Sequence, residues 1–146
     1  MIDPRTMTMI AIGLAIASGP AFGLCTDGRD PQWREEFADS DIVATGTITE
    51  AHRVVDVKDP GGYVATIYGI RIREIFRGRI PRRLHVESEN NTSRFAMDPD
   101  VTYLMFLKRD AASGRYFIDN CGNSAPLDQA RPMLSALRKM RARPVR

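Results

Sequence analysis

The chain has 146 residues, of which 43% are hydrophobic and 27% are charged. This length allows one domain and excludes two, and the balance of apolar and charged residues excludes a chain that is disordered throughout. The formal net charge of +3 says little about partners, because basic residues crowd the C-terminal end. These are Arg138, Lys139, Arg141, Arg143 and Arg146.

Residues 1–23 are predicted to be a cleavable signal peptide. Arg5 precedes a short apolar core at residues 9–16, and the small residues Ala21 and Gly23 favour cleavage before Leu24. The apolar core is far shorter than the roughly 20 residues that a membrane span needs. We therefore expect a secreted or periplasmic protein without a membrane span after cleavage, with an uncleaved anchor as the alternative.

Both cysteines, Cys25 and Cys121, lie after the predicted cleavage site. In an oxidising compartment two cysteines can pair in only one way, so we expect a disulfide between them. Closing so long a loop stabilises a fold by roughly 4–5 kcal/mol in the chain-entropy model. The alternative is two unpaired buried thiols.

The first element after the leader is predicted to be a helix over residues 30–37. Asp30 can cap it, and Pro31 suits its first position. Trp33 and Phe37 are four residues apart, so they share one helix face that can pack on the rest of the domain. The polar segment 39–41 ends the helix.

Five strands follow, rich in β-branched or aromatic residues and separated by turn residues. Their predicted ranges are 42–53, 63–76, 83–87, 102–108 and 116–120. In the first strand Gly46 indicates a bulge or sharp bend, and Ile75 falls out of phase near the end of the second. In the second strand the alternation places one set of residues inside and Arg71 and Arg73 outside. The inward set is Val64, Tyr68, Ile70 and Ile72.

Residues 88–100 are predicted to form a long polar loop, in which Asp98 and Asp100 flank a proline and favour a turn. After the strands, residues 127–140 have helical apolar spacing that Pro132 interrupts early. A helix at each end and no βαβ alternation predict a mainly β domain over residues 24–140, followed by a basic tail at 141–146. The natural architecture is the five-stranded oligonucleotide/oligosaccharide-binding (OB) barrel.

Four stretches resemble the N-terminal domain of the tissue inhibitors of metalloproteinases and the wider netrin-like module, in the form of a bacterial-type relative. They are FADSDIVATGTITEAHRV, YGIRIREIFRGRI, TYLMFLKRD and RYFIDNCGNSAPL. The shared features are Asp41 before the first strand, Phe76-Arg77-Gly78 after the second, Tyr103-Leu104 in the fourth and Cys121 after the fifth. The resemblance implies an OB barrel and a secreted binding role.

In that family a Cys-x-Cys opens the mature protein, and the first cysteine chelates the zinc of the target protease. The resemblance aligns Cys121 with the fifth-strand cysteine and Cys25 with the second of the pair. The first position is then Gly23, and its expected partner near residues 91–94 is also not cysteine. The resemblance therefore implies the fold without the zinc-chelating group.

Other candidate groups are sparse. His52 and His85 lack a neighbouring cysteine or helical histidine, so we interpret them as surface residues and expect no metal site. Ser124 is not in a nucleophile elbow, so we expect no catalytic residue, no enzyme activity and no cofactor. The segment 90–93 holds overlapping glycosylation sequons that matter only in a eukaryotic secretory host.

Two functions remain as hypotheses. The first is a non-catalytic module that binds an extracytoplasmic protein through the edge formed by Leu24, Cys25 and Thr26. The second is a polyanion binder, for glycan or nucleic acid, that uses the basic tail and the arginines around strands two and three. Those arginines are Arg71, Arg73, Arg77, Arg79, Arg82 and Arg83.

Overall fold

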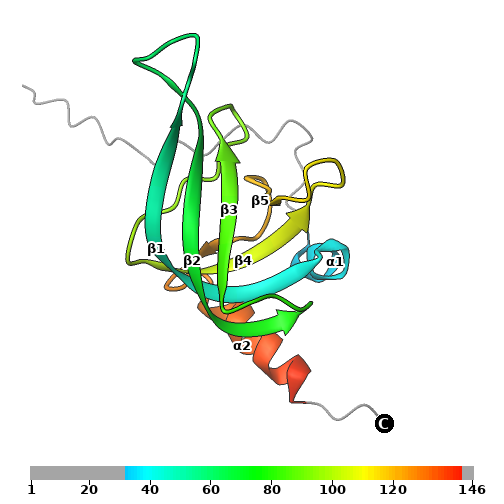
Figure 1. The fold of residues 1–146 in the computed structure, drawn as a ribbon. Coiled ribbons are helices and arrows are strands. Elements are labelled where there is room, and N and C mark those ends of the chain that lie inside the picture. The colour runs from blue at the N-terminus through cyan, green and yellow to red at the C-terminus, as the bar shows by residue number, and fades with distance from the viewer. Residues whose placement is uncertain (1–31, 143–146) are drawn as a thin grey trace, which may run out of the picture.

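A computed structural model describes residues 32–142 of the chain. In chain order the elements are α1 (Trp33–Asp39), β1 (Ile42–Val55), β2 (Tyr63–Arg77), β3 (Arg83–Glu89), β4 (Thr102–Arg109), β5 (Tyr116–Ile118), β6 (Ala125–Pro126) and α2 (Arg131–Arg141). Figure 1 shows long, bent β1 and β2 running together and extending past the other strands as a hairpin.

The strands β1 to β5 form a closed barrel. Their order is β1-β2-β3-β5-β4, and β4 pairs again with β1 to close the ring. All pairs are antiparallel except β3 with β5, which is parallel and contains the single residue pair Val86↔Tyr116. This confirms the predicted five-stranded OB-type barrel with a short helix near its N-terminus and a helix at its C-terminus.

The barrel interior is filled by alternate residues of each strand, as the period of a β-strand requires. Ile48, Ile70, Val86, Met105 and Leu107 are all almost fully buried there. Bulges let the long strands bend around this core: the β1–β2 register shifts between Thr45 and Gly46, and again near the end of β2. Both irregularities were predicted.

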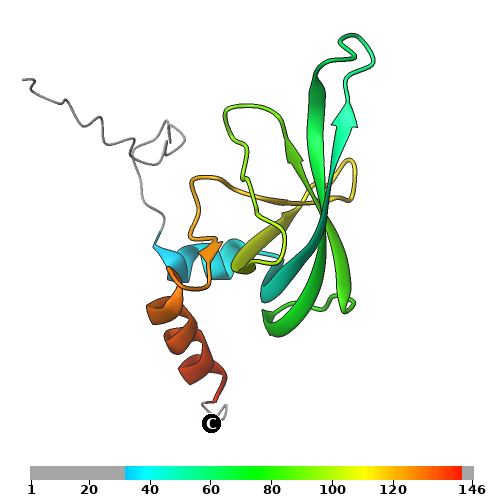
Figure 2. The same cartoon turned by 90° about the vertical axis from the view of Figure 1, so that its left-hand side faces the viewer.

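A second apolar cluster lies outside the barrel, on β1 and β4. Val43, Leu104 and Phe106 point outward there and pack with Leu137 of α2 and with Trp33 and Phe37 of α1. The shared face predicted for Trp33 and Phe37 is thus confirmed. Figure 2 shows both helices together on one side of the barrel, where α2 contacts the end of β2 at Glu74 and Phe76.

Several predicted details were wrong. Helix α1 begins at Trp33 with Gln32 at the N-cap position and no side-chain cap, so Asp30 does not cap it. Val64 is 47% exposed rather than inside, because the β1–β2 hairpin extends beyond the barrel at this point. Pro132 occupies the first turn of α2, where a missing N–H costs nothing, so it begins the helix instead of interrupting it.

Strand lengths also differ from the prediction. Strand β3 continues to Glu89, β5 ends at Ile118, and the short β6 pairs with β4 beside Tyr103 and Leu104. The turn after β2 needs Gly78, whose φ is +83° and whose Cβ would overlap the backbone carbonyl of Asp41. In residues 32–142 no helix is long and apolar enough to cross a membrane.

Candidate functional site

The outer face of β2 and β3 carries an arginine pair. Arg71 of β2 stands directly opposite Arg83 of β3, and both are exposed. Side chains opposite each other on antiparallel strands lie close together, and like charges in that position destabilise the sheet. Within residues 32–142 neither guanidinium has an acidic partner. The sheet therefore holds two adjacent positive charges that nothing described on the surface neutralises.

Arg73 adds a third charge to this face. Its Nε donates a 3.0 Å hydrogen bond to Oγ1 of Thr47, which stands opposite Arg71 across the β1–β2 pair. A hydroxyl is a neutral partner, so Arg73 keeps its full charge. Arg79 and Arg82 are exposed in the connection from β2 to β3. We call Arg71, Arg73 and Arg83 the basic surface; Arg79 and Arg82 lie close to it in the chain.

Arg77, the sixth predicted arginine, is turned toward α1 instead. Its Nε donates a 2.7 Å hydrogen bond to the carbonyl oxygen of Ser40, and its guanidinium lies 5.7 Å from the ring centre of Phe37. These contacts fasten the end of β2 to the end of α1. The register places Arg77 opposite Val43, on the outer side of the sheet like Arg71, but at the end of the strand beside α1.

The arginines of α2 have a carboxylate partner. Arg138 and Arg141 each place Nη2 2.9 Å from a different oxygen of Glu74 on β2. The Glu74 side chain is only 19% exposed, and the Arg141 guanidinium also lies 5.6 Å from the ring centre of Phe76. These two basic residues therefore hold α2 against the barrel. The sequence did not reveal this role, because the pairs join residues more than 60 positions apart.

His52 and His85 meet at one carboxylate. Glu50 Oε2 lies 3.1 Å from His52 Nε2, and Glu50 Oε1 lies 3.6 Å from His85 Nε2. The Glu50 side chain crosses Gly69, where a Cβ would come within 2.5 Å of its Cγ. The hydrogen bond from His52 lowers the pKa of Glu50. In the part of the chain described, no group of side chains is suited to hold a metal ion.

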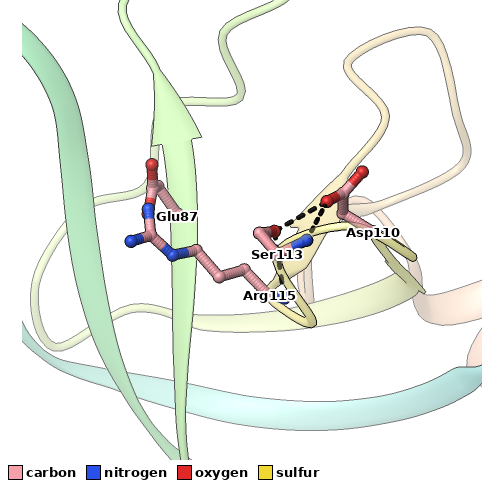
Figure 3. Close-up of polar contacts among 4 residues, drawn as sticks. All are labelled: Glu87, Asp110, Ser113 and Arg115. Carbon is pink, nitrogen blue, oxygen red and sulfur yellow. Dashed lines mark hydrogen bonds and ion pairs between the residues drawn. The ribbon is translucent and has the colours of Figure 1, made fainter.

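A groove of about 570 Å³ opens between the end of β3, the β4–β5 turn and β5. Figure 3 shows the Arg115 side chain extending from the turn toward Glu87 on β3, with which it forms an ion pair. In the same turn Asp110 accepts hydrogen bonds from the backbone N–H and the hydroxyl of Ser113, at 2.6 and 2.7 Å. These bonds lower the pKa of Asp110 and keep its carboxylate charged.

A buried carboxylate joins α1 to the segment after β5. Glu36 is 7% exposed, and its Oε2 accepts hydrogen bonds of 2.6 and 2.7 Å from the backbone N–H and side-chain amide of Asn123. Burial raises the pKa of Glu36, and the bonds from Asn123 oppose that rise. The sequence did not reveal this contact, because an acidic residue in the first turn of a helix is ordinarily explained by the helix dipole.

The remaining candidates have local roles or lie elsewhere. The Ser124 hydroxyl accepts a 2.8 Å hydrogen bond from the backbone N–H of Phe106. Asp98 and Asp100 belong to the predicted turn before β4. Cys121 is not a free thiol. The structure does not describe residues 1–31 and 143–146. The predicted leader and Leu24, Cys25 and Thr26 therefore lie outside the described residues. The predicted pairing of the cysteines and the predicted N-terminal edge thus stay predictions.

No protein-family model matches the chain, and no curated protein matches it.

Proposed function

We propose that this chain is a non-catalytic binding module that acts outside the cytoplasm and holds an anionic glycan on the basic surface. The observation that carries the proposal is the opposition of Arg71 and Arg83 across two strands with no acidic partner in the described residues. Two opposed arginines lower the stability of the free protein, because their like charges repel. Such a pair is expected at a binding site where an anionic ligand supplies the missing negative charge.

The nearby carboxylates support this reading. Glu74 is occupied by Arg138 and Arg141, and Glu50 by the two histidines. Asp41, at the start of β1, accepts a 2.7 Å hydrogen bond from the backbone N–H of Arg109. Within the described residues, none of these three carboxylates pairs with Arg71 or Arg83, which supports their availability to an external anion.

A glycan suits this surface better than a nucleic acid. Binding of single-stranded nucleic acid combines positive charge with aromatic rings on which bases stack. On the described outer face of β2 and β3, no phenylalanine, tyrosine or tryptophan lies among the arginines, because Phe76 packs in the cluster under α2. Sulfate, phosphate or carboxylate groups along a sugar chain need only the guanidinium donors.

Three further elements belong to the same proposal. The predicted signal peptide supports an extracytoplasmic site of action. The resemblance to the netrin-like inhibitors supports a binding role, and the missing first cysteine argues against inhibition through a protease zinc. We retain the Cys25–Cys121 disulfide as part of this proposal. Of the two sequence-based hypotheses, the described residues favour the polyanion over the protein partner at Leu24–Thr26.

Calorimetric titration with a heparin oligosaccharide as the probe tests the proposal. Affinity should fall steeply with salt, because each anionic contact releases counterions. The double variant Arg71→Ser and Arg83→Ser should bind at least about tenfold more weakly and lower the slope of log affinity against log salt by about two. The matched control is Lys58→Ser with Arg94→Ser, which removes two exposed charges elsewhere.

Equal weakening by both double variants would show that only net charge matters and would overturn the proposal. Tighter binding of single-stranded DNA than of heparin, measured in the same buffer, would replace the glycan with a nucleic acid.

A further inference from the structure

The barrel closes between β3 and β5 over the shortest pairing of any two neighbouring strands in it. These strands pair at Val86↔Tyr116 alone, whereas β3 pairs with β2 over seven residue pairs, from Ala65↔Glu89 to Arg71↔Arg83. Beyond Val86, no strand of the described chain lies against the β5-facing edge of Glu87–Glu89. A strand edge without a neighbour is a ready template for another extended chain.

The groove described above lies along this edge. Its apolar lining comes from β5, where Tyr116 is half-buried, Phe117 is 39% exposed and Ile118 is buried. Glu87–Glu89 of β3 forms the opposite wall, and three residues of extended strand span about 10 Å. The groove therefore offers a polar backbone edge on one side and apolar side chains on the other, which is the combination that an added strand requires.

The charge of the groove selects the kind of strand. Four carboxylates line it, from Glu87, Glu89, Asp110 and Asp119, against the single cation Arg115. Arg115 is paired with Glu87. The other three carboxylates accept hydrogen bonds from neutral groups, namely the Asn91 side chain and the backbone N–H groups of Ser113 and Cys121. Their negative charge stays uncompensated within the described residues.

We propose that the β3–β5 groove binds an extended segment of another protein that carries basic side chains. Its backbone pairs with the edge of Glu87–Glu89, alternate side chains contact Phe117, and the lysine or arginine side chains between them meet Glu89, Asp110 and Asp119. This site is separate from the basic surface, and the inference does not depend on the proposed glycan function.

The test uses a capped peptide that alternates lysine and threonine as the probe, with fluorescence anisotropy as the readout. A peptide that alternates glutamate and threonine is the charge control. A lysine–threonine peptide N-methylated at every second residue is the backbone control, since it keeps the charge and loses the donors on one edge. We expect binding of the first peptide only, with affinity at least about tenfold above that of either control.

A matched pair of variants locates the peptide. Glu89→Lys should weaken binding at least about tenfold, because it reverses a charge in the groove. Glu35→Lys reverses an exposed charge on α1 and should leave binding unchanged. Equal effects of the two variants, or full binding by the N-methylated peptide, would overturn the inference. Heparin affinity of Glu89→Lys, measured in parallel, reports on the basic surface separately, so failure at one site is distinguishable from failure at the other.

Discussion

Two sets of arginines lie on neighbouring parts of this molecule and differ in one respect. Arg138 and Arg141 on α2 share the half-buried carboxylate of Glu74. Arg71 and Arg83 face each other across β2 and β3 with no acidic partner among the described residues. From the sequence alone, both sets would be interpreted as basic residues on the protein surface. The structure shows that the first set fastens a helix, which leaves only the second set available to a ligand.

The same contrast runs along β3 itself. Its inward residues Leu84 and Val86 belong to the barrel core. Its outward residues change from Arg83 through His85 to Glu87 and Glu89. The strand therefore presents a positive surface at its start and a negative groove at its end. A single net charge for the domain conceals two surfaces of opposite sign, each suited to a different partner.

The largest expected effect concerns the attachment of α2. Leu137 is 1% exposed and packs with Phe106 and Val43. Leu137→Ala should lower the free energy of unfolding by about 2–5 kcal/mol in urea denaturation, because it leaves a cavity under the helix. Met140→Ala, on an exposed position of the same helix, is the control and should change little. A loss below about 1 kcal/mol for Leu137→Ala would mean that α2 is not held by apolar packing.

Glu36 extends the comparison to a carboxylate that has no cation partner among the described residues. Removing it by Glu36→Ala takes away the acceptor of two hydrogen bonds from Asn123 and should cost about 1–3 kcal/mol. Because burial raises its pKa above the ordinary 4.5, the folded state binds this proton more tightly than the unfolded state does. The contribution of Glu36 to stability is thus greatest at low pH and declines as the pH rises from 4.5 through the folded pKa.

Glu36→Gln removes this titration, so the stability of the wild type relative to that variant should fall as the pH rises from 4.5 toward neutrality. Unfolding curves at a series of pH values measure the difference. A wild type that gains stability over the variant with rising pH would contradict the assigned direction.

Glu74 is the residue that separates the two sets of arginines. Glu74→Gln breaks both ion pairs and should lower stability by about 1–2 kcal/mol, since exposed pairs contribute little and this carboxylate is largely covered. It also frees Arg138 and Arg141, so heparin affinity should rise. If heparin affinity falls in this variant instead, Arg138 and Arg141 bind heparin in the wild type and need Glu74 to hold them in position.

The smallest expected effect is a gain. Replacing Arg71 and Arg83 by serine removes a repulsion between opposed like charges and should stabilise the fold by about 0.2–1 kcal/mol. The gain should vanish at high salt, which screens exposed charges. Urea denaturation at low and high salt measures it. A clear loss of stability at low salt would mean that these arginines serve the fold, as Arg138 and Arg141 do.

Local patterns predicted most of the fold. Gly46, the 59–62 turn and the alternation around Tyr68, Ile70 and Arg71 each predicted strand features that the structure contains, because these signals depend on neighbours in sequence. The barrel order could be predicted only through the element count and the family resemblance. Val64 was misplaced since alternation does not tell how far a hairpin extends past the core.

The site was less accessible to sequence reasoning. The second-strand alternation predicted that Arg71 and Arg73 point outward, yet the opposition of Arg71 to Arg83 needed the strand register. Glu74, Glu36 and Glu50 each contact residues on other elements, and no periodicity reports such long-range pairs. Arg77 differs from the other arginines because it contacts Ser40 and Phe37 at the end of α1, and no local pattern reports a contact between such distant segments.

The most direct test of the account is a map of backbone-amide NMR shifts during titration with a heparin hexasaccharide. We expect the largest shifts in residues 70–73 and 81–84, around the opposed arginines, and small shifts in α2 and at Glu87–Glu89. Shifts centred on Arg138 and Arg141, with none at Arg71 and Arg83, would contradict the claim that the unneutralised pair forms the binding surface.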